Sequence, residues 1–283
     1  MTSIKIRPLC EDLAFGSRIE GVTDRALQDK GVRKELNQVF ENCGLIIFEN
    51  VEPTNKMQLE ISKVFGPLKE HPVKAVDLVD PDKMPGVIEI WSKPETCDIV
   101  EIDGKPYSSW LPWHFDHCYN NELNRAGVLR AVQLTPNGAQ TGFMDCIELY
   151  NAISPDLRER VEGLFIIYSM DMQPAHIRFG KPANFRVLQV DPTQFAILEQ
   201  AKAYPRAIHP PVWTRTTGEK VLHVSPWMSE GIEGHEDPEG DTLLEAVCQE
   251  IIRLSEQRAY YHQWKPTDML IWDNWRMLHR ATG

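Results

Sequence analysis

The sequence has no excess of basic residues, and its formal net charge at pH 7 is −11. A surface of this sign repels nucleic-acid phosphates and anionic lipid headgroups, so we expect neither as a partner. No apolar run approaches the roughly 18 residues of a membrane-spanning helix. The first residues also contain no apolar core of the signal-peptide kind. We therefore expect a cytoplasmic protein without a membrane segment.

Closely paired cysteines and repeats are also missing. The six cysteines are scattered, and no two of them form a Cys-x-x-Cys pair, so we expect reduced thiols. We find no internal repeat and no low-complexity run. The chain has 283 residues, of which 42% are hydrophobic and 9% aromatic. This composition is enough for a packed core, and we expect a single domain over residues 1–283.

Local patterns predict several elements. Apolar residues at helical spacing predict helices over 32–43, from a cap at Thr54 to Gly66, from 155 to 163, and from Asp241 onward. Short apolar runs predict strands at 45–48, 127–134, 164–169, 260–264 and 269–272. The section 172–213 has little periodicity and six prolines. A stretch of this kind is either a functional loop or an ordinary surface excursion.

His114 and Asp116 stand two residues apart in Trp113-His114-Phe115-Asp116-His117. In an extended strand, side chains at i and i+2 point to the same face, so both can aim at one metal ion. A third arm is offered by His279 near the end of the sequence. Two imidazoles and one carboxylate form the facial triad of non-haem Fe(II) oxygenases, which leaves coordination positions open. Ligands so far apart in sequence can meet in a jelly roll.

Other residues compete for the ligand roles. His117 has an odd offset from His114, which would place it on the opposite strand face. Asp273 is a second candidate carboxylate, but it stands at a strand end beside Asn274, where turn chemistry explains it. The remaining histidines without a ligand-like partner at short spacing include His209, His223, His235 and His262. A His-x-Asp pair alone is common in proteins, so its interpretation as part of a metal site depends on the neighbouring stretches of sequence.

Those blocks, in order and spacing over nearly the whole chain, resemble the taurine dioxygenase family, which includes the aryloxyalkanoate dioxygenases. They are Phe15-Gly16-Ser17-Arg18-Ile19-Glu20-Gly21-Val22, Gly44-Leu45-Ile46-Ile47-Phe48, Val64-Phe65-Gly66-Pro67-Leu68, Trp113-His114-Phe115-Asp116, Thr141-Gly142-Phe143 and Trp272-Asp273-Asn274. The resemblance implies a mainly β fold with flanking helices around a double-stranded β-helix, the jelly-roll or cupin-like core. It also implies a lid within 172–213 and a homo-oligomer, either a dimer or a tetramer.

The same resemblance implies an Fe(II)- and 2-oxoglutarate-dependent dioxygenase that hydroxylates a small organic substrate, with release of succinate and CO2. Hydroxylation beside a heteroatom would cleave the substrate, and desaturation is another outcome of this chemistry. His114, Asp116 and His279 would be the iron ligands. Thr141 would bind the 2-oxoglutarate carboxylate, although Ala139 and Gln140 stand where the family more often has glycine and an acidic residue.

His71 matches the family position that contacts the anionic group of taurine, so an anionic substrate is expected, and Trp110 and Phe115 are candidates to shape its pocket. The family also anchors 2-oxoglutarate with an arginine ten or more residues beyond the distal histidine. The sequence ends at Gly283, four residues after His279, so we expect the C-terminal end to be incomplete. Two alternatives stay open: a zinc hydrolase that uses the same three ligands, and a non-catalytic binding protein that has the same jelly-roll fold.

Overall fold

The computed structural model describes residues 4–74, 76, 78–80, 82, 84, 86–135 and 138–283. Its largest sheet has five strands in the order β1-β2-β3-β15-β6. Strands from both ends of the chain meet there, because β15 pairs with β3 on one side and β6 on the other. The bounds are Lys5–Pro8 for β1, Ser17–Glu20 for β2, Leu45–Phe48 for β3, Ala126–Arg130 for β6 and Met269–Asp273 for β15.

A second sheet, β14-β7-β16, is joined to the first through a shared hydrophobic core. Its strands are Tyr260–His262 (β14), Thr141–Asp145 (β7) and Met277–Ala281 (β16). Phe143 of β7 and Met277 of β16 belong to the same buried cluster as Leu270 and Trp272 of β15 and Leu45 and Ile47 of β3. Two sheets, antiparallel except for the parallel pair β2–β3, pack over one core, which is the expected jelly-roll arrangement.

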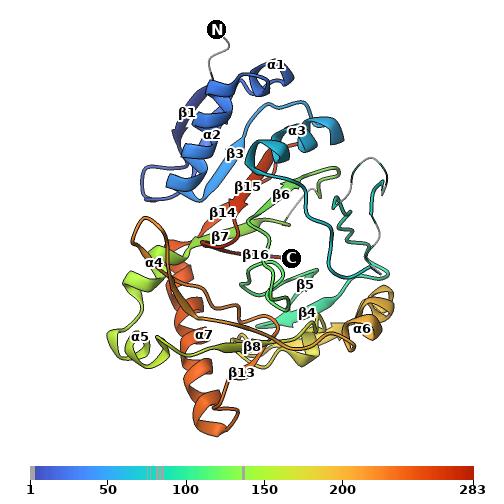
Figure 1. Cartoon of the computed structure of the whole chain (residues 1–283). Helices are drawn as coiled ribbons and strands as arrows, with labels where there is room; N and C mark the ends of the chain where they lie inside the picture. Colours follow the sequence, from blue (N-terminus) through green and yellow to red (C-terminus); the bar gives the residue numbers. More distant parts are fainter. Residues whose placement is uncertain are drawn as a thin grey trace.

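The outer face of the five-stranded sheet is covered by three helices near one end of the molecule (Figure 1). These are α1 (Asp24–Leu27), α2 (Lys30–Cys43) and α3 (Asn55–Phe65). Because strand side chains alternate, Ile46 and Phe48 of β3 and Ile271 of β15 point to the helices rather than into the jelly roll. Gly44 ends α2 in a left-handed conformation, with φ of 72°, which glycine adopts without steric cost.

At the other end of the molecule, the 21-residue helix α7 (Pro238–Arg258) packs against β13 and β7 and lies beside α4 and α5 (Figure 1). The other elements there are α4 (Cys146–Ala152), α5 (Pro155–Val161), β8 (Ile166–Tyr168), β10 (Ala207–His209), β11 (Val212–Thr214), β12 (Lys220–Leu222) and β13 (Ser229–Ile232). Within the described ranges, no helix has both the length and the apolar character needed to cross a membrane.

The section 172–213 contains more regular structure than its sequence pattern indicates. It includes η1 (Pro174–His176), β9 (Arg186–Gln189), η2 (Pro192–Gln194) and α6 (Phe195–Ala201), besides β10 and the start of β11. β9 joins β4 (Ile99–Ile102) and β5 (Lys105–Ser108) in the small sheet β5-β4-β9. Strands this short are defined by distant partners rather than by local periodicity.

Several predicted elements are confirmed, and others differ at their ends. β3 has its predicted bounds, and Thr54 caps α3 as predicted. The strand predicted over 127–134 ends at Arg130, since its partner β15 begins at the paired Met269. The helix predicted from Asp241 begins at Pro238, because Asp237 caps it. The strand predicted around His114 is wrong, since this segment makes only one isolated bridge, to His279.

Candidate metal and cosubstrate site

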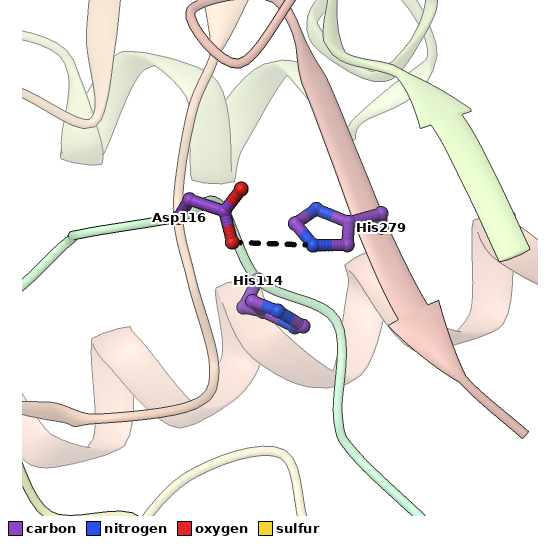
Figure 2. Close-up of side chains that lie close together, drawn as sticks. All are labelled: His114, Asp116 and His279. Atoms are coloured by element: carbon purple, nitrogen blue, oxygen red, sulfur yellow. Dashed lines mark ion pairs between the residues drawn. The ribbon is translucent and has the colours of Figure 1, made fainter. Parts of the chain in front are cut away.

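His114, Asp116 and His279 converge on one point. One ligand atom from each side chain lies within 4.8 Å of the other two, which is the spacing of a group able to hold a metal ion. Figure 2 shows His279 projecting from a strand, and His114 and Asp116 from the neighbouring irregular segment. Both histidines are buried, whereas the Asp116 side chain is 30% exposed. The predicted trio is therefore brought together, with an accessible side left at the carboxylate.

Backbone pairing fixes the two histidines relative to each other. β16 pairs with β7 with His279 opposite Phe143. On its other edge, the N–H of His279 donates to the His114 carbonyl at 2.8 Å, and the N–H of His114 donates back at 2.9 Å. The two imidazole centroids are 4.1 Å apart as a result. Although His114 is not in a strand, this single bridge does the positioning that the predicted strand would have done.

The environment of His114 favours a neutral metal ligand. Its Nδ1 lies 2.8 Å from the Pro112 carbonyl oxygen, so Nδ1 carries the proton and the Nε2 lone pair is free. Burial, together with the charge of His279, lowers the pKa of His114 to about 3. The imidazole therefore stays unprotonated at neutral pH, as metal binding requires.

Asp116 is held as a carboxylate. Burial alone would raise its pKa, but the charge and hydrogen bond of His279, with the charge of His114, outweigh burial and lower the pKa. Its Oδ1 lies 3.4 Å from Nε2 of His279. Two imidazole nitrogens and one ionised oxygen form a donor set that suits a divalent iron ion, with positions left open.

Asp273 is not free to compete as the carboxylate. It is buried and forms an ion pair with Arg125, and its Oδ1 also accepts from the Trp275 N–H at 3.0 Å. Its role is to hold the turn between β15 and β16, in agreement with the interpretation from sequence.

Thr141 lies on the same side of its strand as the metal-site histidine. Phe143, two residues further along β7, has its ring stacked on that of His279, with centroids 6.2 Å apart and planes 22° apart. The alternation of strand side chains places Thr141 on this face too. Its Oγ1 accepts a hydrogen bond of 3.1 Å from Nε1 of Trp264. An indole N–H can only donate, so the threonine hydroxyl keeps its own proton for another acceptor.

His71 and His117 form a pair beside Asp116. Their rings meet edge to face with centroids 5.2 Å apart. Nδ1 of His71 is 3.1 Å from both the N–H and the carbonyl oxygen of Val73, which leaves its Nε2 edge for other contacts. His117 has a φ of 59°, and its Nδ1 is buried without a hydrogen-bond partner in the described part of the chain.

The strand geometry on which the prediction for His117 rested is absent, and His117 is not among the three residues whose ligand atoms converge. The chain turns at Asp116–His117 instead of continuing as a strand, so the alternation rule fails there. Burial lowers the pKa of His117 to about 4, with His71 and Lys69 adding to the shift and Asp116 opposing it. Burial also lowers the pKa of His71. Both rings are therefore neutral at pH 7.

Trp110 and Phe115 lie in the core. The Trp110 ring packs against Phe185, with centroids 5.5 Å apart, and against the Arg280 guanidinium. The Phe115 ring stacks on His223 at a centroid distance of 3.8 Å and an interplanar angle of 18°. These surroundings favour a packing role for both residues, and their contact with substrate remains a prediction.

Three residues close to the site were not singled out from the sequence. Trp227 meets the His114 ring edge on, with centroids 4.8 Å apart, and Trp272 lies 4.7 Å from the His279 ring. Asn274 contacts the Asp116 backbone through its side chain. The signal for two of them was present, since Trp272 and Asn274 stand in the Trp272-Asp273-Asn274 block.

The chain is similar to known proteins over nearly its whole length. Residues 5–283 match the family model described as taurine catabolism dioxygenase TauD, TfdA family. The chain is 29% identical over 280 residues to a (S)-phenoxypropionate/alpha-ketoglutarate-dioxygenase of Sphingobium herbicidovorans, covering 98% of this chain and 88% of the relative. It is 25% identical to an alpha-ketoglutarate-dependent 2,4-dichlorophenoxyacetate dioxygenase of Cupriavidus pinatubonensis, covering 94% and 88% of the two chains.

The fold recurs in solved structures. A taurine dioxygenase from Burkholderia xenovorans superposes with a TM-score of 0.67 at 22% identity, covering 99% of this chain and 84% of that one. At this level of identity the likeness concerns the fold, and it confirms the predicted jelly roll.

Proposed function

Because the chain belongs to the TauD/TfdA family of Fe(II)- and 2-oxoglutarate-dependent dioxygenases, we propose that His114, Asp116 and His279 are its iron ligands and that it hydroxylates a small anionic substrate. The observation that carries the proposal is the convergence of the three ligand atoms within 4.8 Å. The reaction class, of the EC 1.14.11 type, consumes 2-oxoglutarate and O2 and releases succinate and CO2.

When bound, the iron supplies the oxidising chemistry; the protein supplies position, protonation state and exclusion of water. The His114 proton on Nδ1 is held by the Pro112 carbonyl, so the tautomer is fixed and Nε2 is the atom that would bind the metal. The rings of Trp227, Phe143 and Trp272 pack around the two histidines. Such apolar walls keep bulk water from the site.

Thr141 is the proposed contact for the distal carboxylate of 2-oxoglutarate. Two observations support this proposal. Thr141 lies on the face of the sheet that also carries His279, and its hydroxyl already accepts a hydrogen bond from Trp264, so its own proton is left to donate. A hydroxyl that donates to a carboxylate makes a charge-assisted hydrogen bond, which is stronger than a neutral one. The proposal for Thr141 thus rests on this chain's own contacts as well as on the family pattern.

The substrate is proposed to carry a carboxylate or sulfonate group held by His71 and His117. Two neutral imidazoles beside Asp116 offer hydrogen-bond donors to an anion in a site sheltered from water. The relatives named for phenoxypropionate and 2,4-dichlorophenoxyacetate act on carboxylates. Hydroxylation next to a heteroatom would cleave such a molecule, and desaturation is the other proposed outcome.

The section 172–213 is proposed as the lid of this pocket. Tyr204 within it donates a hydrogen bond of 3.1 Å to the Pro72 carbonyl, next to His71. The Phe185 ring packs against Trp110, four residues before His114. The segment therefore contacts both stretches that carry the candidate site residues. A single domain, a homo-oligomeric assembly and a cytoplasmic location remain predictions.

The experiment that tests the proposal measures succinate formed from 2-oxoglutarate under air with Fe(II) and ascorbate. His114→Ala, Asp116→Ala and His279→Ala should each abolish both succinate formation and Fe(II) binding while the protein stays folded. His235→Ala, at an exposed histidine remote in sequence from the ligands, is the matched control and should retain both. Succinate formation by Asp116→Ala at a near-normal rate would remove Asp116 from the site, and a zinc hydrolase or a binding protein would form no succinate at all.

A further inference from the structure

The side-chain amide of Asn274 pairs with the backbone of Asp116 from both of its ends. Oδ1 accepts from the Asp116 N–H at 2.8 Å, and Nδ2 donates to the Asp116 carbonyl at 3.0 Å. A peptide N–H can only donate and a peptide carbonyl can only accept, so these contacts fix the orientation of the amide. Asn274 is completely buried. Its amide therefore takes the place that a neighbouring strand would have beside Asp116.

Asp116 needs such a partner because the chain leaves regular structure just before it. The bridge to β16 ends at His114, and the backbone turns at His117 with a left-handed φ of 59°. A carboxylate on an irregular turn has no ladder to hold it, and its side chain is 30% exposed. A metal ligand must nevertheless be held within about 0.5 Å of its working position.

Asn274 is itself anchored to two other segments. Its N–H donates to the Arg125 carbonyl at 3.1 Å, and Nδ2 also donates to Oδ1 of Asn124 at 3.0 Å. Its carbonyl oxygen lies 2.9 Å from Nε2 of His223. The His223 ring stacks on Phe115, the residue between the two nearby ligands. Movement of Asn274 would therefore disturb several buried contacts at once.

The connection between β15 and β16 also leads to the distal histidine. Asn274 lies in the turn after β15, and His279 lies in β16, which follows that turn and belongs to the neighbouring sheet. His279 stands opposite Phe143 of β7 on one edge of β16 and is hydrogen-bonded to His114 on the other. One short stretch of chain thus sets the positions of His279 directly and of Asp116 through the Asn274 amide, although Asp116 is far away in the sequence.

The geometry points to Asn274 as a positioning residue for the metal site, which fixes the Asp116 carboxylate relative to His279. This inference rests on the proposed function, since it takes Asp116 as a ligand. Residues that orient metal ligands typically contribute 10–100-fold to metal affinity. Loss of the Asn274 amide should therefore weaken metal binding even in protein that remains folded.

The test is an anaerobic calorimetric titration of the apo protein with Fe(II) alone. Asn274→Asp keeps the size of the side chain and one acceptor but replaces the donor, so carbonyl oxygens of Asp116 and Asn124 would face a carboxylate oxygen. Asn274→Ala removes both contacts. Each variant should raise the dissociation constant for Fe(II) about 10–100-fold. Melting temperatures of the apo proteins, measured in parallel, separate this effect from lost stability.

The matched control is Asn37→Ala. Asn37 donates two hydrogen bonds to backbone carbonyls, of Arg33 and Val64, at 2.9 Å each, but in the helical layer away from the metal site. It should lower stability without changing Fe(II) affinity. Asn124→Ala, at a half-exposed position, leaves Asn274 in place but removes one of its anchors. Asn124→Ala should also weaken Fe(II) binding. This test does not require that an Asn274 variant folds.

Two different failures are distinguishable. If Asp116→Ala abolishes Fe(II) binding while folded Asn274→Asp, Asn274→Ala and Asn124→Ala bind Fe(II) within twofold of the unsubstituted protein, the inference is overturned and Asn274 is only structural. The inference is equally overturned if Asn124→Ala binds Fe(II) normally and the Asn274 variants do not fold. If Asp116→Ala itself binds Fe(II) normally, the proposed ligand set fails instead.

Discussion

Replacing Thr141 with valine keeps the shape of the side chain and deletes its hydroxyl. Two hydrogen bonds involve that group: one received from Trp264 Nε1 at 3.1 Å and one proposed to the 2-oxoglutarate carboxylate. A hydrogen bond to a charged partner contributes about 1.5–3 kcal/mol. The KM for 2-oxoglutarate should therefore rise roughly ten- to a hundredfold, because the lost bond is made only when the cosubstrate is bound.

Trp264→Phe separates the two hydrogen bonds. It removes the indole N–H that orients the hydroxyl but leaves the hydroxyl in place, so its effect is bounded by one neutral hydrogen bond of about 0.5–1.5 kcal/mol. The KM should rise less than in Thr141→Val. Since both changes act through one oxygen atom, the double variant should resemble Thr141→Val alone rather than show additive losses.

The assay is succinate formation at saturating substrate and O2 over a range of 2-oxoglutarate concentrations, with anaerobic titration of the Fe(II)–2-oxoglutarate absorption as a direct measure of binding. Thr242→Val is the control, because that exposed hydroxyl donates only to the Pro238 carbonyl within α7. A KM within twofold of the unsubstituted value for Thr141→Val would refute the cosubstrate role. Additive losses in the double variant would refute the link through Trp264.

Three other outcomes are expected. His71→Ala and His117→Ala should each weaken binding of the primary substrate while sparing 2-oxoglutarate binding and uncoupled succinate formation; if coupling of succinate to product is unchanged in both, neither ring holds the substrate. Burial lowers the pKa of His223 from 6.5 to about 3, so between pH 3 and pH 6.5 this histidine takes up a proton in the unfolded chain but not in the folded protein. The free energy of unfolding should therefore fall below pH 6.5, by up to about 1.4 kcal/mol per pH unit for this group. His223→Phe should flatten the dependence of the melting temperature on pH. Arg276→Met should cost about 3–5 kcal/mol in chemical denaturation because it leaves the buried Asp145 carboxylate unpaired; a loss below about 1 kcal/mol would contradict that reasoning.

Elements fixed by local chemistry could be predicted from the sequence. α2 and α3 each combine an apolar stripe with a capping residue or a terminal glycine, and these signals lie within the helices themselves. β16 could not be found in this way. Its residues 277–281 show no clear alternation, and the strand exists because β7 pairs with it on one edge and His114 bridges it on the other.

The candidate site shows the same division. The i, i+2 spacing of His114 and Asp116 led to two side chains that the structure brings together, although the segment is a bridge followed by a turn and not a strand. The alternation rule does not apply one residue later, at His117, because its left-handed φ of 59° breaks the strand geometry on which the rule depends. The His117 ring lies beside that of His71.

Asn274 shows why a supporting residue is harder to find than a ligand. An asparagine after a strand is well explained by turn chemistry, and nothing local indicates that its amide is turned toward Asp116. That contact requires the turn between β15 and β16 to lie against the segment after His114. The requirement also explains the order of dependence in the site: pairing of β16 with β7 places His279, the bridge to His279 places His114, and the turn between β15 and β16 then places Asp116. Disruption of this connection should therefore affect all three ligands, whereas a change of the Asn274 side chain should affect the carboxylate alone.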